Sequence, residues 1–138
     1  MDNFDLTTLI RLIVALFLGG LIGWEREKKG RSAGLRTHIL VTTGSALVML
    51  MGVYLGDAAR IAAGVITGIG FLGGGAIIQS QQDTRGMTTA ASIWISAGIG
   101  LAAGCGYYSA AIFGTIVTLF TLAVLKKIER EEKGNGRP

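Results

Sequence analysis

Long apolar stretches separated by short charged intervals dominate this sequence. Half of the 138 residues are hydrophobic and 16% are charged, whereas a soluble domain carries roughly a quarter charged residues. The charges gather in clusters, and the stretches between them approach the length of about 20 apolar residues that a helix needs to cross a bilayer. A soluble helical bundle would instead place charge regularly along one face of each helix. The distribution predicts a single-domain, all-α integral membrane protein.

Five apolar stretches predict about five transmembrane helices. We expect the spans at about residues 6–24, 37–56, 61–78, 87–106 and 107–125, within a transmembrane domain of residues 1–125 that is followed by a charged tail at 126–138. Only a turn rich in glycine and tyrosine separates the last two spans, which suits a tight connection at the bilayer interface. The third span contains six glycines, so it is the one whose helix could be broken or re-entrant where protein shields it.

The positive charges lie mainly on one side of this five-span arrangement. The first loop, the third loop and the tail carry eleven of the thirteen Lys and Arg residues, and the other side has Arg60, with Arg11 about a turn inside the first span. An excess of Lys and Arg marks cytoplasmic loops, so we predict that the N-terminus is outside and the C-terminus is cytoplasmic. The basic balance is an orientation signal and predicts no nucleic-acid partner, because no aromatic residues interleave the charges. Asp2 and Asp5 replace the basic start of a signal peptide, so we expect the first span to be retained.

Glycines recur at helical spacing in several of the predicted spans. Small residues let helix backbones approach closely in lipid. We expect such helix packing at Gly19/Gly23, Gly52/Gly56, Gly100/Gly104 and, on two faces of the third span, at Gly64, Gly68, Gly70, Gly74 and Gly75. Two glycine faces on one helix predict that the third span is central and clamped between neighbours.

Two of the predicted spans carry a stripe of hydroxyl side chains. The second span has His38, Thr42 and Ser45 on one side, and the fourth has Arg85, Thr89, Ser92 and Ser96. Such hydroxyls commonly bond the carbonyl four residues earlier and hold helices together. Alternatively, the stripes form a polar seam along a cavity open to the cytoplasm, with Arg36, Arg85 and His38 at its mouth.

The acidic residues and the possible reaction centres are also informative. Every Asp and Glu lies at a terminus or in a loop, whereas magnesium and proton pathways usually need oxygen ligands within the span. The 25–29 cluster either anchors the first span at the interface or pairs with Arg36, Arg85 or Asp83, and we expect an outer-loop pair between Asp57 and Arg60. Cys105 has no histidine partner for nucleophilic catalysis. We therefore predict no enzyme activity, no metal site and no cofactor.

Several segments resemble the MgtC/SapB family of bacterial membrane proteins. They are residues 19–27, 33–41, 60–63, 68–73 and 85–91, which occur in order and at the family's spacing within a match from about Arg11 to Leu125. The resemblance implies a multi-pass protein of the bacterial inner membrane with a regulatory role in magnesium homeostasis, low-magnesium adaptation and virulence. It also implies the membrane sector of the F-type ATP synthase as a possible partner. The polar residues that match the family's motifs are Glu25, Arg26, Glu27, Arg36, Thr37, His38, Arg60, Arg85, Thr88 and Thr89.

The sequence departs from the family pattern in two places. Members of the MgtC type continue into a soluble domain of the ACT type, which is not found before Pro138, and Gly64 stands where a glutamine is common. Our leading hypothesis is a regulator that binds a membrane complex or a cytoplasmic ligand through its arginine rim. The alternatives are a small transporter or channel for an ion or small solute, and a structural assembly subunit. Because five short glycine-rich helices make a thin wall, we expect a homo-oligomer in the lipid bilayer.

Overall fold

A computed structural model describes residues 2–80 and 83–125, with side chains described for 6–80 and 86–125. Within these residues the chain forms five α-helices and no strand. The helices are α1 (Asp2–Lys28), α2 (Leu35–Tyr54), α3 (Ala58–Gln79), α4 (Asp83–Cys105) and α5 (Tyr108–Phe120), and a single π-helical segment, η1 (Thr121–Leu125), continues α5. All five are long and apolar enough to cross a membrane when α5 is taken together with η1. The predicted fold class is confirmed, while the orientation in the membrane stays a prediction.

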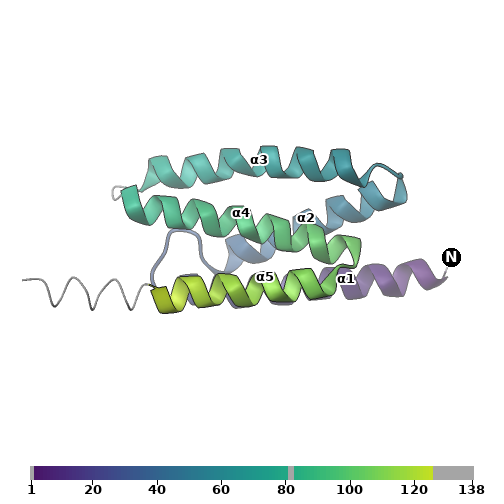
Figure 1. Cartoon of the computed structure of the whole chain (residues 1–138), viewed down its shortest axis with the longest axis horizontal. Helices are drawn as coiled ribbons and strands as arrows, with labels where there is room; N and C mark the ends of the chain where they lie inside the picture. The colour runs from purple at the N-terminus through teal and green to yellow at the C-terminus, as the bar shows by residue number, and fades with distance from the viewer. Residues whose placement is uncertain (1, 81–82, 126–138) are drawn as a thin grey trace, which may run out of the picture.

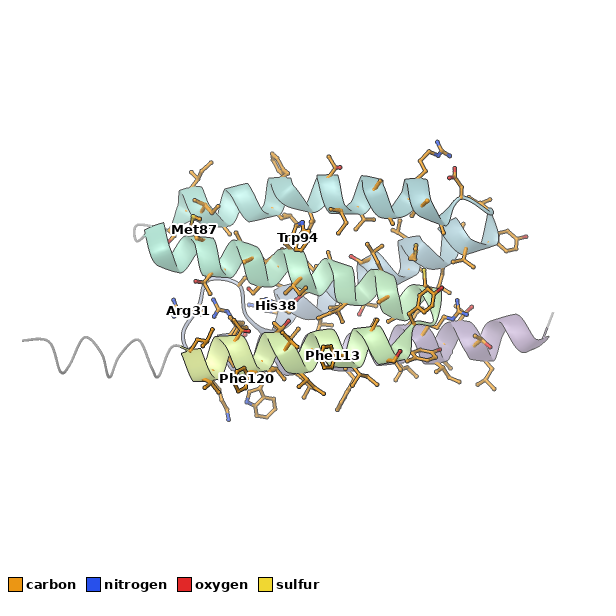
Figure 2. The ribbon with its side chains drawn as sticks, in the orientation of Figure 1. Arg31, His38, Met87, Trp94, Phe113 and Phe120 are labelled. Atoms are coloured by element: carbon orange, nitrogen blue, oxygen red, sulfur yellow. The ribbon has the colours of Figure 1, made fainter. Side chains whose placement is uncertain are left out.

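The five helices lie side by side, with α4 in contact with all four others (Figure 1). More than half of the α4 span is buried, compared with 6% of the α3 span. In Figure 1 α3 runs along one edge of the bundle, and α5 runs along the opposite edge in front of α1. Large apolar side chains such as Phe71, Phe113 and Phe120 are exposed on the outside, as expected for helices whose neighbours are lipid tails. The outward phenylalanines of α5 are labelled in Figure 2.

The third span differs from its prediction in two respects. It is a continuous helix, α3, and is neither broken nor re-entrant. It also lies at the edge of the bundle, with only Ile69 and Gly73 buried, so the prediction of a central, clamped helix is wrong for a single chain. The reason is that α3 packs through one narrow face against α4 and α2. A Cβ atom added at any of the glycines on its two predicted packing faces would meet nothing within 4 Å, and these are Gly64, Gly68, Gly70, Gly74 and Gly75.

Other glycines do bring helices close together, as predicted, except Gly56, which lies in the turn after α2 and would meet nothing within 4 Å of an added Cβ atom. A Cβ atom on Gly23 of α1 would lie 2.7 Å from the Cα atom of Leu35. On α4, a Cβ atom on Gly104 would lie 2.6 Å from the carbonyl oxygen of Ala46. Both distances are too short for a real side chain, so α1 and α4 each approach the backbone of α2 closely. In lipid this shape match replaces the hydrophobic effect as the source of helix association.

Three helices end in the same glycine turn. Gly30, Gly56 and Gly106 have φ angles of 61°, 72° and 84°, and they follow α1, α2 and α4. This left-handed backbone favours glycine and forms the Schellman motif, in which the next residue bonds back across the last helical turn. After α1 the backbone N–H of Arg31 donates to the carbonyl oxygen of Arg26 at 3.1 Å. The turn therefore holds Arg31 directly over the end of α1.

Candidate functional site

The end of the bundle where α1 finishes and α2 begins carries most of the conspicuous polar chemistry. We call it the basic end and define it by residues 25–37 together with the facing part of α4. Residues 25–36 include five cations and two carboxylates. Figure 2 shows Arg31 on the loop that precedes α2, at the same end of the bundle as Met87.

Arg26 is buried inside this end of the bundle. Its residue is 1% exposed, although it was predicted to be either an interface anchor or part of a rim. Its Nη2 donates to Oγ1 of Thr89 at 3.2 Å, and its Nη1 lies 4.0 Å from a carboxylate oxygen of Glu25. The Nε–H has no hydrogen-bond partner among the described residues. A buried guanidinium is costly unless it is paired and hydrogen-bonded, so this arginine joins α1 to α4 at an energetically sensitive point.

His38 continues this polar cluster from α2. The residue is fully buried, with Nδ1 2.8 Å from the carbonyl oxygen of Gly34 and Nε2 3.1 Å from Oγ of Ser92. Because Nδ1 faces a carbonyl, it carries a proton and donates. The Ser92 hydroxyl also lies 2.7 Å from the Thr89 carbonyl oxygen. When the imidazole is neutral, Nε2 is an acceptor, so the single hydroxyl proton of Ser92 is donated either to Nε2 or to the Thr89 carbonyl oxygen. We call Arg26, His38, Thr89 and Ser92 the buried polar cluster.

The two predicted hydroxyl stripes face each other in the contact between α2 and α4. Thr42, Ser45 and Ser96 are all buried. The Thr42 hydroxyl donates to the His38 carbonyl oxygen at 2.9 Å, and the Ser96 hydroxyl donates to the Ser92 carbonyl oxygen at 2.8 Å. A Cβ atom on Gly100 of α4 would overlap the Thr42 carbonyl oxygen. These contacts fit the packing interpretation of the stripes rather than a cavity along them.

The two carboxylates of the basic end bind within α1 and to the start of α2. Glu25 forms an ion pair with Lys29, whose Nζ also donates to the Leu122 carbonyl oxygen at 3.2 Å and so ties α1 to η1. Oε2 of Glu27 accepts from the backbone N–H of Leu35 at 2.6 Å. A carboxylate at this position accepts from one of the free N–H groups of the first helical turn. Its negative charge is also stabilised by the positive end of the helix dipole. Sequence reasoning missed the contacts of Lys29 with Leu122 and of Glu27 with Leu35, because one joins separate helices and the other crosses the loop.

A pocket of about 410 Å³ opens at the basic end. Its lining includes Arg31, Ser32, Arg36 and Thr37. Nε and Nη1 of Arg31 are buried without a hydrogen-bond partner in the described structure, whereas Arg36 is exposed. Ser32 and Thr37 also line a second pocket of about 550 Å³, which continues along apolar residues of α3 such as Phe71. Arg36 and Thr37 were predicted as rim residues, but Arg31 was not.

The remaining predicted residues are dispersed. Asp57 and Arg60 form the expected pair at the opposite end, with Arg60 Nε 2.5 Å from Oδ2 of Asp57. Thr88 is exposed, and the side chain of Arg85, like that of Asp83, lies outside the described residues. At the opposite end Arg11 donates from Nη1 to the Gly104 carbonyl oxygen at 2.8 Å, where the last carbonyls of α4 lack helical partners. In the part of the chain that the structure describes, no cluster of three or more His, Cys, Asp or Glu residues could hold a metal ion.

Comparison with known proteins connects this arrangement to one family. A model of the MgtC family matches residues 12–131. The chain is 44% identical over 131 residues to the candidate magnesium transporter YhiD of Escherichia coli strain K12, covering 87% of this chain and 61% of that protein. It is 42% identical over 121 residues to the protein MgtC of Salmonella typhimurium, covering 86% of this chain and 52% of that protein. The protein SrpB of Synechococcus elongatus is 39% identical over 137 residues, with 87% and 75% covered.

The chain thus spans about half to three quarters of the length of these relatives. No solved structure matches it significantly. The family match covers four of the five spans completely and most of the first, and it includes every member of the buried polar cluster. This multi-pass membrane protein belongs to the MgtC family.

Proposed function

We propose that this protein is a regulator of magnesium homeostasis in the bacterial inner membrane, and that it acts by binding a membrane complex or a cytoplasmic ligand at its basic end. The observation that carries the proposal is the open pocket beside Arg31 and Arg36, at the same end as a buried polar cluster that links α1, α2 and α4. Family membership and the magnesium-related name of YhiD support the connection with magnesium.

The charges favour regulation over direct magnesium transport. Magnesium binds through oxygen ligands and retains several of its waters. Contrary to the prediction that every carboxylate lies in a loop or at a terminus, the first described span, Leu6–Lys28, includes Glu25 and Glu27 near its end, while the other four contain no Asp or Glu. Cations outnumber these carboxylates five to two at residues 25–36. A positively charged entrance raises the local concentration of anions and lowers that of a divalent cation. The connection with magnesium is therefore indirect in this proposal.

The buried polar cluster connects the basic end to α4 inside the bundle through hydrogen bonds. Arg26 connects the end of α1 to α4 through Thr89, and His38 connects the start of α2 to the same helix through Ser92. Glu27 holds the end of α1 to the first turn of α2. A ligand or partner that moves the 29–34 loop therefore also acts on hydrogen bonds to α4. This is the physical basis on which we propose a regulatory surface.

The test combines liposome flux with growth of a bacterium that lacks its own family member. We expect the wild-type protein and Arg60→Gln to restore growth in low magnesium, and Arg36→Gln to fail, although each variant removes one exposed arginine. Liposomes containing a magnesium-sensitive dye should show no protein-dependent influx. Magnesium flux that Arg36→Gln abolishes would favour the transporter alternative. Full growth with Arg36→Gln would contradict the role of the basic end.

We also propose that α3 is the contact face of a homo-oligomer. Glycine lowers helix stability relative to alanine, and five glycines of α3 contact no other helix among the described residues. Their presence on a lipid-facing helix is explained if another helix packs closely against them. Replacing Gly68 by Leu should lower the oligomer fraction seen by mass spectrometry from nanodiscs, while Ala110→Leu on the exposed face of α5 should leave it unchanged. Equal oligomer fractions in the two variants would contradict this role for α3. Co-purification with the membrane sector of the F-type ATP synthase would identify the alternative partner.

A further inference from the structure

Two arginines at the basic end have buried donors that no described residue accepts. These donors are Nε of Arg26 and both Nε and Nη1 of Arg31. The two charges are close enough to repel each other, and a backbone hydrogen bond of 3.1 Å joins their residues. Buried polar groups are nearly always hydrogen-bonded, and an unpaired charged donor is the costliest exception. Among the described residues, no side chain or carbonyl therefore accepts from these three donors.

The pocket beside Arg31 has the donors that such an acceptor needs. Its volume is about 410 Å³, and Ser32, Arg36 and Thr37 line it together with Arg31. It lies at the start of α2, where the first intrahelical bond runs from His38 N to Gly34 O at 3.2 Å. The backbone N–H groups of Arg36 and Thr37 precede that bond and so lack helical acceptors. Two guanidinium groups, two hydroxyls and a helix N-terminus thus meet at one pocket.

The carboxylates nearby neutralise this pocket only in part, since Glu27 offsets one of its two arginines. Glu25 is paired with Lys29, and Glu27, which also lines the pocket, accepts from the backbone N–H of Leu35. The remaining balance of residues 25–36 is positive. A guanidinium is a planar fork that matches the oxygens of carboxylates and phosphates. Donors that arrive from a side chain, a rim arginine and a helix terminus suit the tetrahedral oxygens of a phosphate better than the two coplanar oxygens of a carboxylate.

We propose that this pocket binds a phosphate group, with Arg31 as the main ligand, Arg36 at the rim and the N-terminus of α2 completing the site. The inference deepens the proposed function, because it names the chemical class of ligand for the basic end. The phosphate belongs either to a soluble phosphate compound or to the headgroup of an anionic phospholipid. Both sources present the same oxygens to Arg31, and the experiment separates them.

Binding can be measured on the purified full chain in nanodiscs. In discs of phosphatidylcholine alone, inorganic phosphate is titrated while the melting temperature is followed by circular dichroism, since a ligand that binds only the folded state raises it. A second set of discs contains phosphatidylglycerol and no added phosphate. Arg31→Gln removes the proposed ligand. Lys28→Gln removes a charge from the same end outside the pocket, and Arg60→Gln removes one from the opposite end.

We expect Arg31→Gln to weaken phosphate binding by about tenfold or more, the usual effect of losing a charge-assisted hydrogen bond. Lys28→Gln and Arg60→Gln should bind as the wild type does. An Arg31-dependent response to inorganic phosphate identifies a soluble ligand, and one seen only with phosphatidylglycerol identifies a lipid headgroup.

Two outcomes would overturn the proposal. One is the absence of any Arg31-dependent response in both sets of discs, and the other is an equal loss in Lys28→Gln. Arg36→Gln serves as a second variant if Arg31→Gln loses its helical spectrum, and it should then weaken binding while the two controls do not. The growth assay above is independent of these measurements, so failure of phosphate binding with intact complementation would leave the regulatory proposal standing.

Discussion

The close contact between α4 and α2 yields the sharpest stability prediction, through two glycines of the same helix. A Cβ atom on Gly100 would overlap the Thr42 carbonyl oxygen and lie 2.8 Å from Cβ of Ser45, whereas one on Gly98 would meet nothing within 4 Å. The obstructing oxygen belongs to the backbone of α2, which cannot turn aside as a side chain can. Gly100→Ala must therefore push the two helices apart, and Gly98→Ala must not.

The expected difference in unfolding free energy between the two variants comes from the cost of overpacking, because both variants share the gain in helix propensity. Replacing Gly by Ala in a helix gains about 1 kcal/mol of intrinsic stability, and this gain is common to both positions. Overpacking a close-packed contact costs about 1–3 kcal/mol, and only Gly100→Ala incurs it. We expect Gly98→Ala to be neutral or slightly stabilising. Gly100→Ala should be less stable than Gly98→Ala by about 1–3 kcal/mol.

The assay is reversible unfolding in mixed micelles, with the fraction of denaturing detergent raised stepwise and helicity followed by far-ultraviolet circular dichroism. The difference between the two midpoints isolates the helix contact because the propensity gain cancels. Equal midpoints for Gly98→Ala and Gly100→Ala would refute the close approach of α4 to α2. A more stable Gly100→Ala would refute it more strongly.

Three further predictions concern the buried polar cluster and the orientation. Ser92→Leu removes the hydroxyl near His38 Nε2 and adds bulk, so it should lower the unfolding free energy by about 1–3 kcal/mol. Ile93→Leu should lower it by less than about 1.5 kcal/mol. Equal losses would show that the hydroxyl stripe of α4 does not face α2. Arg26→Met should stay within about 1 kcal/mol of the wild type, because Glu25 keeps its ion pair with Lys29 and no buried charge is left unpaired. The variant should nevertheless fail to support low-magnesium growth, and normal growth would show that function does not need Arg26. In a cysteine-free background, an impermeant maleimide should label Tyr54→Cys in intact cells and Lys28→Cys only after permeabilisation, and the reverse pattern would overturn the predicted orientation.

Local features of the chain could be predicted well because their physics is local. The length and apolar character of each span determine that it forms a helix in lipid, where every backbone group must be satisfied within the segment. The pair between Asp57 and Arg60 is three residues apart on one helical turn, so its geometry needs no other part of the fold. The stripe that contains Ser92 and Ser96 follows from helical periodicity alone. These expectations agree with the structure.

What only the tertiary structure decided is which helix each face meets. Periodicity places Gly64 and Gly68 on one face of α3, but it does not say whether another helix of the same chain covers that face, and none of the described helices does. Arg26 was expected at the interface and is buried because α4 supplies Thr89, a residue 63 positions away. In lipid no hydrophobic force selects the partner, so the choice depends on shape and on hydrogen bonds between distant segments. The amino-acid sequence therefore determined the five spans, and the packing of α1 and α4 on α2 decided where the buried polar cluster lies.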